Sequence, residues 1–173
     1  TEIKLGQTMP YSGPVSALGA IGHAQVAYFQ KINAEGGING RMVRLISLDD
    51  GYNPAKAVEQ VRRMVEQEEV LLIFSSVGTS TNLAVRKYLN AKKVPQLLTG
   101  GGDSAWGDYK HYPWTMGWMP TYRDEARLYA RHILQKHPDA KIAVLYLNDD
   151  YGREYLQGLK DGLGDNATRM IVA

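Results

Sequence analysis

The stretch Val70-Leu71-Leu72-Ile73-Phe74 is a continuous apolar run of strand length. It lacks the alternation of a half-exposed strand, so it predicts a strand covered on both faces, as in a parallel sheet. Segments of strand pattern and helix pattern alternate on both sides of this run. The alternation predicts an α/β fold built on a Rossmann-like, open and doubly wound parallel sheet.

The bounds of the expected elements follow from apolar spacing and from the Gly, Pro and Asn residues between segments. The expected strands span 3–9, 42–48, 70–74, 94–99 and 141–147. The expected helices span 15–34, 53–69, 83–91, 124–137 and 151–163. Asn53 is expected to cap the second helix and 79–82 to supply cap residues before the third. The aromatic-rich stretch 106–122 is expected to be irregular.

A weak internal repeat suggests a second domain. Residues 45–52 resemble residues 144–152, and in both a strand passes through paired aspartates into a helix. We therefore expect a first domain over 1–120 and the beginning of a second over 121–173. The final run 169–173 has the pattern of a strand that is cut short. The start at Thr1 shows neither a basic nor an apolar leader region, so we expect that a signal peptide has been removed.

The composition excludes several classes of protein. The chain has 173 residues, of which 44% are hydrophobic and 22% charged, as in ordinary globular proteins. It has no cysteine, which excludes thiolate zinc sites, iron–sulfur clusters and disulfides. A net charge of +2 is far from the basic surplus that phosphate-backbone binding needs, so we expect no nucleic-acid partner. No apolar run approaches the roughly 20 residues of a membrane-spanning helix.

Catalytic motifs are missing from the sequence. There is no phosphate-binding loop, no nucleophile elbow and no His-Glu-x-x-His helix, and the four histidines lack metal-ligand spacing. The pairs Asp49-Asp50 and Asp149-Asp150 follow strands and could hold a metal ion in an α/β enzyme. Acidic residues ahead of a helix also stabilise its N-terminus, by about 0.3 to 1 kcal/mol. We favour this structural role, and we expect no metal and no cofactor.

Three segments meet at the edge where the strands of an open α/β sheet end and where ligands bind. Segment 77–81 joins small residues and hydroxyls to a helix N-terminus, which attracts an anion such as a carboxylate. Segment 100–104 lets a ligand approach the backbone, and 11–14 leads to Val15 and Leu18, an apolar wall. Each segment alone would be an ordinary turn, but together they predict a binding site. The aromatic stretch 118–122 lies at the expected domain crossing, a common place for a ligand cleft.

The sequence resembles the periplasmic solute-binding proteins of branched-chain amino-acid-type ABC transporters, the type I periplasmic binding proteins. The resemblance rests on 3–6, Ser12-Gly13-Pro14, the element Ile-Asn-Ala-Glu-Gly-Gly-Ile-Asn-Gly at 32–40, Asp49-Asp50, 94–97 and 148–152. It implies two Rossmann-like lobes that clamp a ligand by hinge closure. Such proteins are about twice this length, so the chain is expected to hold the first lobe and the start of the second.

The resemblance also implies which residues contact the ligand. Gly78, Thr79, Gly102 and Ser104 would hold the ligand carboxylate with hydroxyls and backbone N–H groups. Leu18 matches a position that is aromatic in some members, and Gly78 replaces a serine of leucine-binding relatives, which argues against strict amino-acid recognition. Tyr151 matches a second-lobe tyrosine that faces the cleft, and Tyr122 is added from the domain crossing. The expected ligand contacts are thus Leu18, Gly78, Thr79, Gly102, Ser104, Tyr122 and Tyr151.

The resemblance implies a non-enzymatic protein of the periplasm with two partners, a small-molecule carboxylate ligand and an ABC permease in the membrane. The rings at 113–118 and Tyr122 favour an aromatic or hydrophobic acid over a branched-chain amino acid. We expect a monomer. Two alternatives stay open. One is a metal-dependent α/β enzyme that uses Asp49 and Asp50 or the second aspartate pair, and the other is the ligand-sensing domain of a receptor.

Overall fold

The computed structural model of the chain describes residues 2–172 and divides into two compact units. Unit 1 comprises Thr1–Gly101 and Trp106–Trp118, and unit 2 comprises Gly102–Ala105 and Met119–Ala173. Each unit is described by itself. The interpretation of 1–120 and 121–173 as two lobes of a binding protein stays a prediction.

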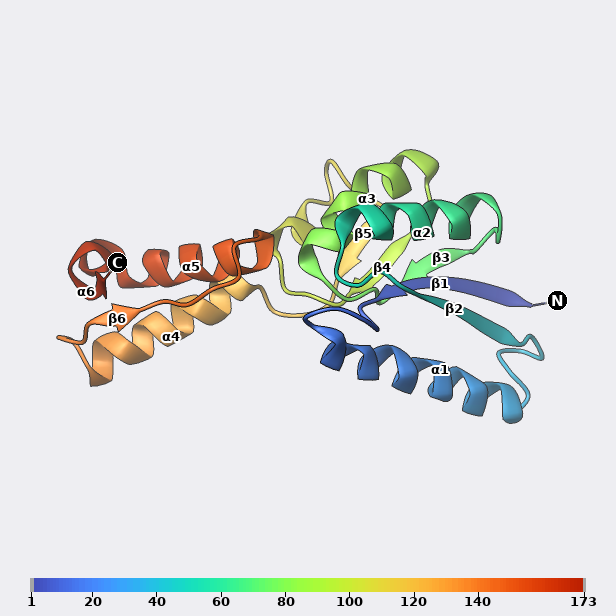
Figure 1. Cartoon of the computed structure of the whole chain (residues 1–173), viewed down its shortest axis with the longest axis horizontal. Helices are drawn as coiled ribbons and strands as arrows, with labels where there is room; N and C mark the ends of the chain where they lie inside the picture. The colour runs from blue at the N-terminus through green and yellow to red at the C-terminus, as the bar shows by residue number, and fades with distance from the viewer. Residues whose placement is uncertain (1, 173) are drawn as a thin grey trace. The chain divides into compact units, whose positions relative to one another are not determined.

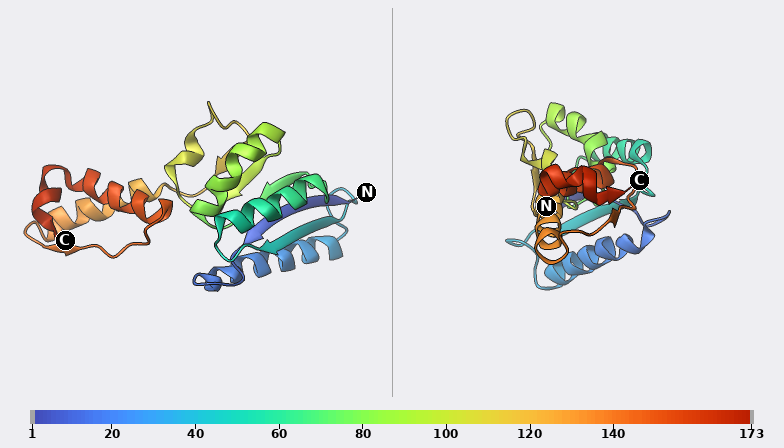
Figure 2. Two further views of the ribbon diagram at one scale, coloured as in Figure 1. Left: turned by 45° about the horizontal axis from the view of Figure 1, so that its top comes forward. Right: turned by 90° about the vertical axis from the view of Figure 1, so that its left-hand side faces the viewer.

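Unit 1 is built on a five-stranded sheet in the order β2-β1-β3-β4-β5, with every neighbouring pair parallel. Helix α1 lies against one face of the sheet, and α2 and α3 lie against the other (Figures 1 and 2). The predicted α/β class and open parallel sheet are therefore confirmed. The strands are β1 (Ile3–Met9), β2 (Val43–Asp49), β3 (Leu72–Phe74), β4 (Gln96–Thr99) and β5 (Thr115–Gly117), and the helices are α1 (Gly19–Ala34), α2 (Pro54–Glu66) and α3 (Thr79–Lys92).

The core of unit 1 lies between the sheet and the helices α2 and α3. Helix α2 begins as predicted, with the Asn53 side chain accepting a hydrogen bond from the Lys56 N–H at 3.0 Å and with Pro54 at the first helical position. Its apolar stripe then packs against β3 and α3, and each fully buried aliphatic side chain contributes about 1.5–3 kcal/mol. The buried members are Ala57, Val61, Met64, Val70, Ile73, Val85 and Leu89.

Several predicted bounds in unit 1 were wrong. A 3-10 turn (η1, Ser16–Leu18) precedes α1, where one continuous helix was expected. Helix α2 ends at Glu66 and β3 begins only at Leu72, because the chain turns through Glu69 at a φ of 54° before Val70 enters the core. Residues 79–82 are not caps but the first turn of α3. The stretch 106–122 contains a short strand, β5, and its first residues belong to a 3-10 turn, η2 (Ser104–Gly107).

Unit 2 consists mainly of helices α4 (Tyr122–Lys136) and α5 (Asp150–Leu163), which pack along each other (Figure 1). A Cβ atom at Gly162 would collide with Ala130, so small residues allow the close approach of the two helices. The remaining elements are β6 (Ile142–Ala143), η3 (Gly164–Asn166), α6 (Ala167–Met170) and β7 (Ile171–Val172), with β6 and β7 parallel.

The predicted strand over 141–147 was too long, since only two of its residues pair with β7 and Leu145 is fully exposed. The predicted terminal strand begins at Ile171, because α6 takes up the residues through Met170; Ala173 lies outside the described residues. Within 2–172, no helix has both the length and the hydropathy needed to cross a membrane.

Candidate ligand-binding site

The segments after β3 and β4 are joined by hydrogen bonds at the carboxyl edge of the sheet. Gly100 N–H donates to the Ser76 carbonyl at 2.8 Å, and Gly78 N–H donates to the Gly100 carbonyl at 3.2 Å. The neighbouring strand β1 is bound to the same segments, because the Thr8 N–H donates to the Ser76 hydroxyl at 2.9 Å. Two of the loops predicted to form the ligand edge are therefore held together with the end of β1.

Gly78 fixes the turn that leads into α3. Its φ of 122° and ψ of 128° strain any residue with a side chain. An added Cβ would also collide with the Thr81 hydroxyl and lie 3.0 Å from the ring of Tyr52. A serine at this position is incompatible with this backbone. Residue 78 therefore offers only main-chain atoms, and its N–H donates to the Gly100 carbonyl.

Thr79 begins α3 directly after this turn and is 2% exposed. The Thr79 hydroxyl therefore belongs to a side chain that is almost fully buried. The first N–H groups of an α-helix also lack intrahelical acceptors, and the helix dipole makes this end partially positive. The turn at Gly78 and Thr79 therefore combines a buried hydroxyl with amide donors, which suits a negatively charged oxygen.

A buried chain of side-chain amides orients the same turn. Asn82 uses both hydrogens of its Nδ2, donating to the carbonyls of Ser76 at 2.8 Å and Gly78 at 2.7 Å. The Asn82 Oδ1 accepts from Gln96 Nε2 at 2.9 Å, and the Gln96 Oε1 accepts from the Thr115 hydroxyl at 3.1 Å. Asn82 therefore holds both carbonyl oxygens of the turn in hydrogen bonds. From the sequence, Asn82 was expected only as a helix cap, and Gln96 and Thr115, which are far from it in the chain, were missed.

Two buried polar atoms of unit 1 that lie after strands have no partner among the described residues. They are the Asp50 Oδ2 after β2 and the Thr99 Oγ1 at the end of β4. Burial raises the pKa of Asp50, while the Tyr52 N–H that donates to Oδ1 at 2.8 Å opposes this shift. Buried polar atoms are normally paired with protein or with ordered water, so this edge has hydrogen-bonding capacity left over.

The neighbouring Asp49 is fully used as a structural anchor. Its carboxylate accepts from the Ser12 N–H and hydroxyl, the Gly51 N–H and the Lys56 ammonium, at 2.6–3.0 Å. The hydrogen bond from Lys56 is the main cause that holds the pKa of Asp49 far below its ordinary value. Asp49 therefore ties the loop after β1 to the start of α2, which leaves it no free oxygen for a metal ion.

The second aspartate pair is also structural. Asp149 caps α5, accepting from the Gly152 N–H at 3.0 Å, and Asp150 forms an ion pair with Arg153 at 3.1 Å. These contacts favour the predicted role of acidic residues at helix starts. Across 2–172, no group of three or more His, Asp or Glu side chains is placed to hold a metal ion.

In unit 2, Gly102 packs directly against the start of α4. Its carbonyl accepts a hydrogen bond from the Tyr122 N–H at 2.7 Å. A Cβ at Gly102 would collide with the Pro120 carbonyl and lie 3.1 Å from the Tyr122 ring. Ser104 follows in a 3-10 turn and is exposed, and its N–H lies 3.4 Å from the Glu154 carboxylate. The structure therefore joins the predicted residues Gly102 and Tyr122.

Tyr122 and Tyr151 belong to a trio of rings completed by Tyr155. Tyr122 meets Tyr151 edge-on at 4.9 Å and stacks on Tyr155 at 4.9 Å, and Tyr151 meets Tyr155 edge-on at 5.3 Å. The Tyr155 hydroxyl donates to the Glu125 carboxylate at 2.6 Å, and the Tyr129 hydroxyl donates to the same carboxylate. Tyr155 was missed, although its spacing of four residues from Tyr151 on one helix could have indicated it.

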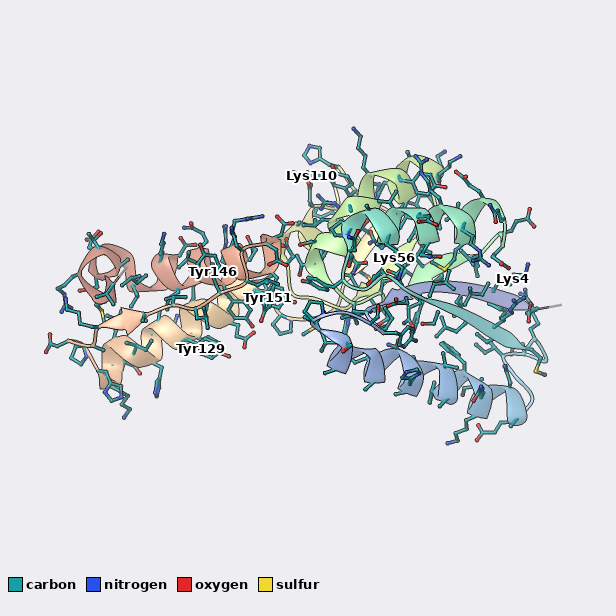
Figure 3. The ribbon with its side chains drawn as sticks, in the orientation of Figure 1. Lys4, Lys56, Lys110, Tyr129, Tyr146 and Tyr151 are labelled. Atoms are coloured by element: carbon teal, nitrogen blue, oxygen red, sulfur yellow. The ribbon has the colours of Figure 1, made fainter. Side chains whose placement is uncertain are left out.

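The predicted contacts thus fall into two groups. Gly78 and Thr79 share one turn in unit 1, and Leu18, 41% exposed in η1, lies in the same unit on a different loop. Gly102, Ser104, Tyr122 and Tyr151 belong to unit 2, where Tyr151 also borders an apolar cavity of about 320 Å³ with Tyr129 and Tyr146 (Figure 3). That these seven residues together hold a ligand stays a prediction.

Known proteins similar to this chain carry one common description. The sequence profile described as "Periplasmic binding protein" matches residues 2–170. The Leu/Ile/Val-binding protein homolog 7 of Brucella abortus is 25% identical over 188 residues, which cover 99% of this chain and 45% of that protein. The chain thus spans about half the length of the curated relatives it matches.

Solved structures show the same fold. A substrate-binding periplasmic protein from Ralstonia solanacearum has a TM-score of 0.87 at 25% identity, covering 98% of this chain and 48% of its own. A solute-binding protein of an ABC transporter from Rhodopseudomonas palustris BisB5, in complex with 3,4-dihydroxy benzoic acid, has a TM-score of 0.74 at 18% identity, covering 93% and 43%. With the profile match over nearly all of its residues, the chain belongs to the periplasmic binding protein family.

Proposed function

We propose that this chain is part of the solute-binding component of an ABC importer, and that it binds a small carboxylate without transforming it. One observation supports the proposal above the others. The turn at Gly78 and Thr79 offers helix N-terminal amides and the hydroxyl of Thr79, a residue that is 2% exposed, at the carboxyl edge of a parallel sheet. Open α/β sheets bind their ligands at this edge.

The physics of the turn favours an anion over a neutral group. Amide dipoles and the helix dipole act more strongly where water is excluded, because the effective dielectric constant is lower there. The Asn82 side chain keeps the carbonyl of Gly78 at 2.7 Å from its Nδ2, so this carbonyl oxygen is turned away from a bound anion. A carboxylate oxygen can therefore accept hydrogen bonds here without meeting a competing acceptor.

The rings of unit 2 support the proposed ligand class. Tyr122 and Tyr151 present aromatic surface, which pairs with another ring for about 0.5–1.5 kcal/mol beyond simple burial. We therefore rank an aromatic or hydrophobic acid ahead of a branched-chain amino acid. The palustris protein of the same fold is in complex with such an acid, whereas the Brucella relative is named for leucine, isoleucine and valine.

The family also supplies the setting of the proposed function. Membership of the periplasmic binding proteins supports a periplasmic location and a membrane permease as partner in this proposal. In this proposal 1–120 and 121–173 are the first lobe and the beginning of the second, with Leu18, Gly102 and Ser104 as further contacts. The ligand would shift the population of open and closed forms by its difference in affinity for the two.

Thermal melting of the full-length protein with a panel of small acids tests this function. The panel contains benzoate, hydroxybenzoates, cinnamate and leucine, together with benzamide, the uncharged amide that corresponds to benzoate. We expect at least one aromatic acid to raise the melting temperature, since a ligand that binds only the native state stabilises it, and benzamide to have no effect. A response to leucine alone would contradict the ligand class, and no response to any member would contradict the proposed site.

A further inference from the structure

A groove lies beside α3 in unit 1, apart from the turn at Gly78 and Thr79. It has a volume of about 540 Å³ and lies between the second half of α3 and the loop 110–114. Residues 93 and 114 come directly before the segments that enter β4 and β5, so the groove lies at the amino end of these strands. The turn at Gly78 and Thr79 follows the carboxyl end of β3, and parallel strands place these two features at opposite edges of the sheet. The lining residues are Lys87, Asn90, Ala91, Lys93, Lys110, His111, Tyr112, Pro113 and Trp114, which we call the α3 groove.

The charges in the α3 groove are of one sign and unpaired. Lys87, Lys93 and Lys110 are all exposed, and within residues 2–172 none of the three forms an ion pair. Figure 3 shows Lys110 on the loop beside α3. The adjacent carboxylate, that of Asp108, is bound to His111 at 2.7 Å, and this hydrogen bond lowers the pKa of Asp108. The groove therefore has three lysine charges without a protein partner.

The aromatic wall of the α3 groove is held in place. Asn90 accepts the Trp114 N–H at 2.9 Å and donates to the Thr115 hydroxyl at 2.8 Å. The Arg86 guanidinium lies 3.8 Å from the centre of the Tyr112 ring, a close cation–π contact. The Trp114 side chain is nevertheless 38% exposed. The groove is therefore a fixed surface that needs no ordering when a partner binds, which lowers the cost of association.

We propose that the α3 groove binds an acidic peptide segment of a partner protein. Unpaired lysines on an exposed rim attract a chain of carboxylates and speed up its association. An open groove suits an extended segment better than a small molecule, which is usually enclosed over 70–90% of its surface. Lysine is a point charge, so the geometry lacks the arginine forks that fit a phosphate group with two hydrogen bonds. Because the groove and the turn at Gly78 lie at opposite edges of one sheet, the partner leaves that turn accessible.

Fluorescence anisotropy with a fluorescein-labelled peptide of Glu, Ser and one Tyr tests the proposal on the full chain. The variant Lys87→Glu/Lys93→Glu/Lys110→Glu should weaken binding at least about tenfold at low salt. The matched control Lys31→Glu/Lys136→Glu/Lys160→Glu makes the same change in net charge at exposed sites elsewhere, and it should stay within about twofold of the wild type. A Trp114→Ala variant should also weaken binding, which a purely electrostatic attraction would not show.

Two checks distinguish binding in the α3 groove from unfolding of the variants and from a general attraction to anionic surfaces. All the substituted lysines are exposed, so each variant should keep the melting temperature of the wild type. If the triple Glu variant of the groove is less stable, a triple Lys→Gln variant at the same positions replaces it in the binding measurement. Vesicles of phosphatidylglycerol form a second arm. The proposal is overturned if the wild type does not bind the peptide at low salt, if both Glu triples weaken binding equally, or if the groove triple weakens binding to vesicles but not to the peptide.

Discussion

The turn at Gly78 and Thr79 in unit 1 and the tyrosine trio in unit 2 hold the predicted ligand contacts in different ways. The turn is made of main chain and small side chains, and the buried amides of Asn82 and Gln96 fix its direction. The trio is made of three tyrosine rings on two helices, and the Glu125 carboxylate accepts a hydrogen bond from the Tyr155 hydroxyl. The turn therefore depends on a buried polar network, whose disruption is costly, and the trio on packing, which tolerates small changes.

The largest expected effect comes from Gln96→Leu. Gln96 is 1% exposed, and the leucine would leave the Asn82 Oδ1 without its donor and the Thr115 hydroxyl without its acceptor. We expect the free energy of unfolding to fall by about 3 kcal/mol. Urea denaturation measures it, with the exposed Gln157→Leu on α5 as the matched control. A loss as small as that of the control would show that the network does not hold the turn.

A smaller effect is expected from Asp49→Asn, and it should depend on pH. The folded state lowers the pKa of Asp49, so its stabilising contribution is fully present above the ordinary value of 3.8 and declines as the pH falls from there towards the lowered pKa. At pH 7 the variant should be less stable by about 1 kcal/mol, because the group is partly exposed. Melting temperatures at pH 7 and pH 3 measure this. A difference between wild type and variant that is the same at both pH values would contradict the assigned role.

The smallest effect is expected in the trio, from Tyr155→Phe. The ring stays against Tyr122 and Tyr151, and only the hydroxyl that donates to Glu125 at 2.6 Å is lost. Glu125 keeps the Tyr129 hydroxyl as a donor, so we expect a loss of about 0.5 kcal/mol. Chemical denaturation measures it, with Tyr155→Ala as the variant that removes the ring as well. If the two variants were equally unstable, the packing of the rings would not be what stabilises the trio.

The sequence predicted those elements of the fold that a local pattern of residues determines. The strand at Ile3–Met9 and the cap at Asn53 were correct, since period-two alternation and the Asn-Pro pair each have one structural meaning. The strand expected over 141–147 spans only Ile142–Ala143. An apolar run in a sequence does not reveal how many of its residues will find a neighbouring strand to pair with. Strand β5 was missed for the same reason: three residues among aromatic ones give no pattern.

The candidate site was predicted only as far as its chain segments. Gly78 and Thr79 were identified from small residues ahead of a helix, but the start of α3 was placed four residues too late. A φ of 122° at Gly78 makes the helix begin there, and no sequence pattern shows a backbone angle. The network through Asn82 and Gln96 could not be predicted, because residues 14 positions apart meet only after the sheet has formed.

The central claim is that the turn at Gly78 and Thr79 binds a negative charge. Isothermal titration of the full-length protein with its best aromatic acid and with the corresponding amide tests it most directly, in the wild type and in Thr79→Val. The account predicts that the wild type prefers the acid by at least about tenfold, or about 1.4 kcal/mol, and that Thr79→Val loses much of this preference. Equal binding of acid and amide by the wild type, or an unchanged preference in Thr79→Val, would contradict it.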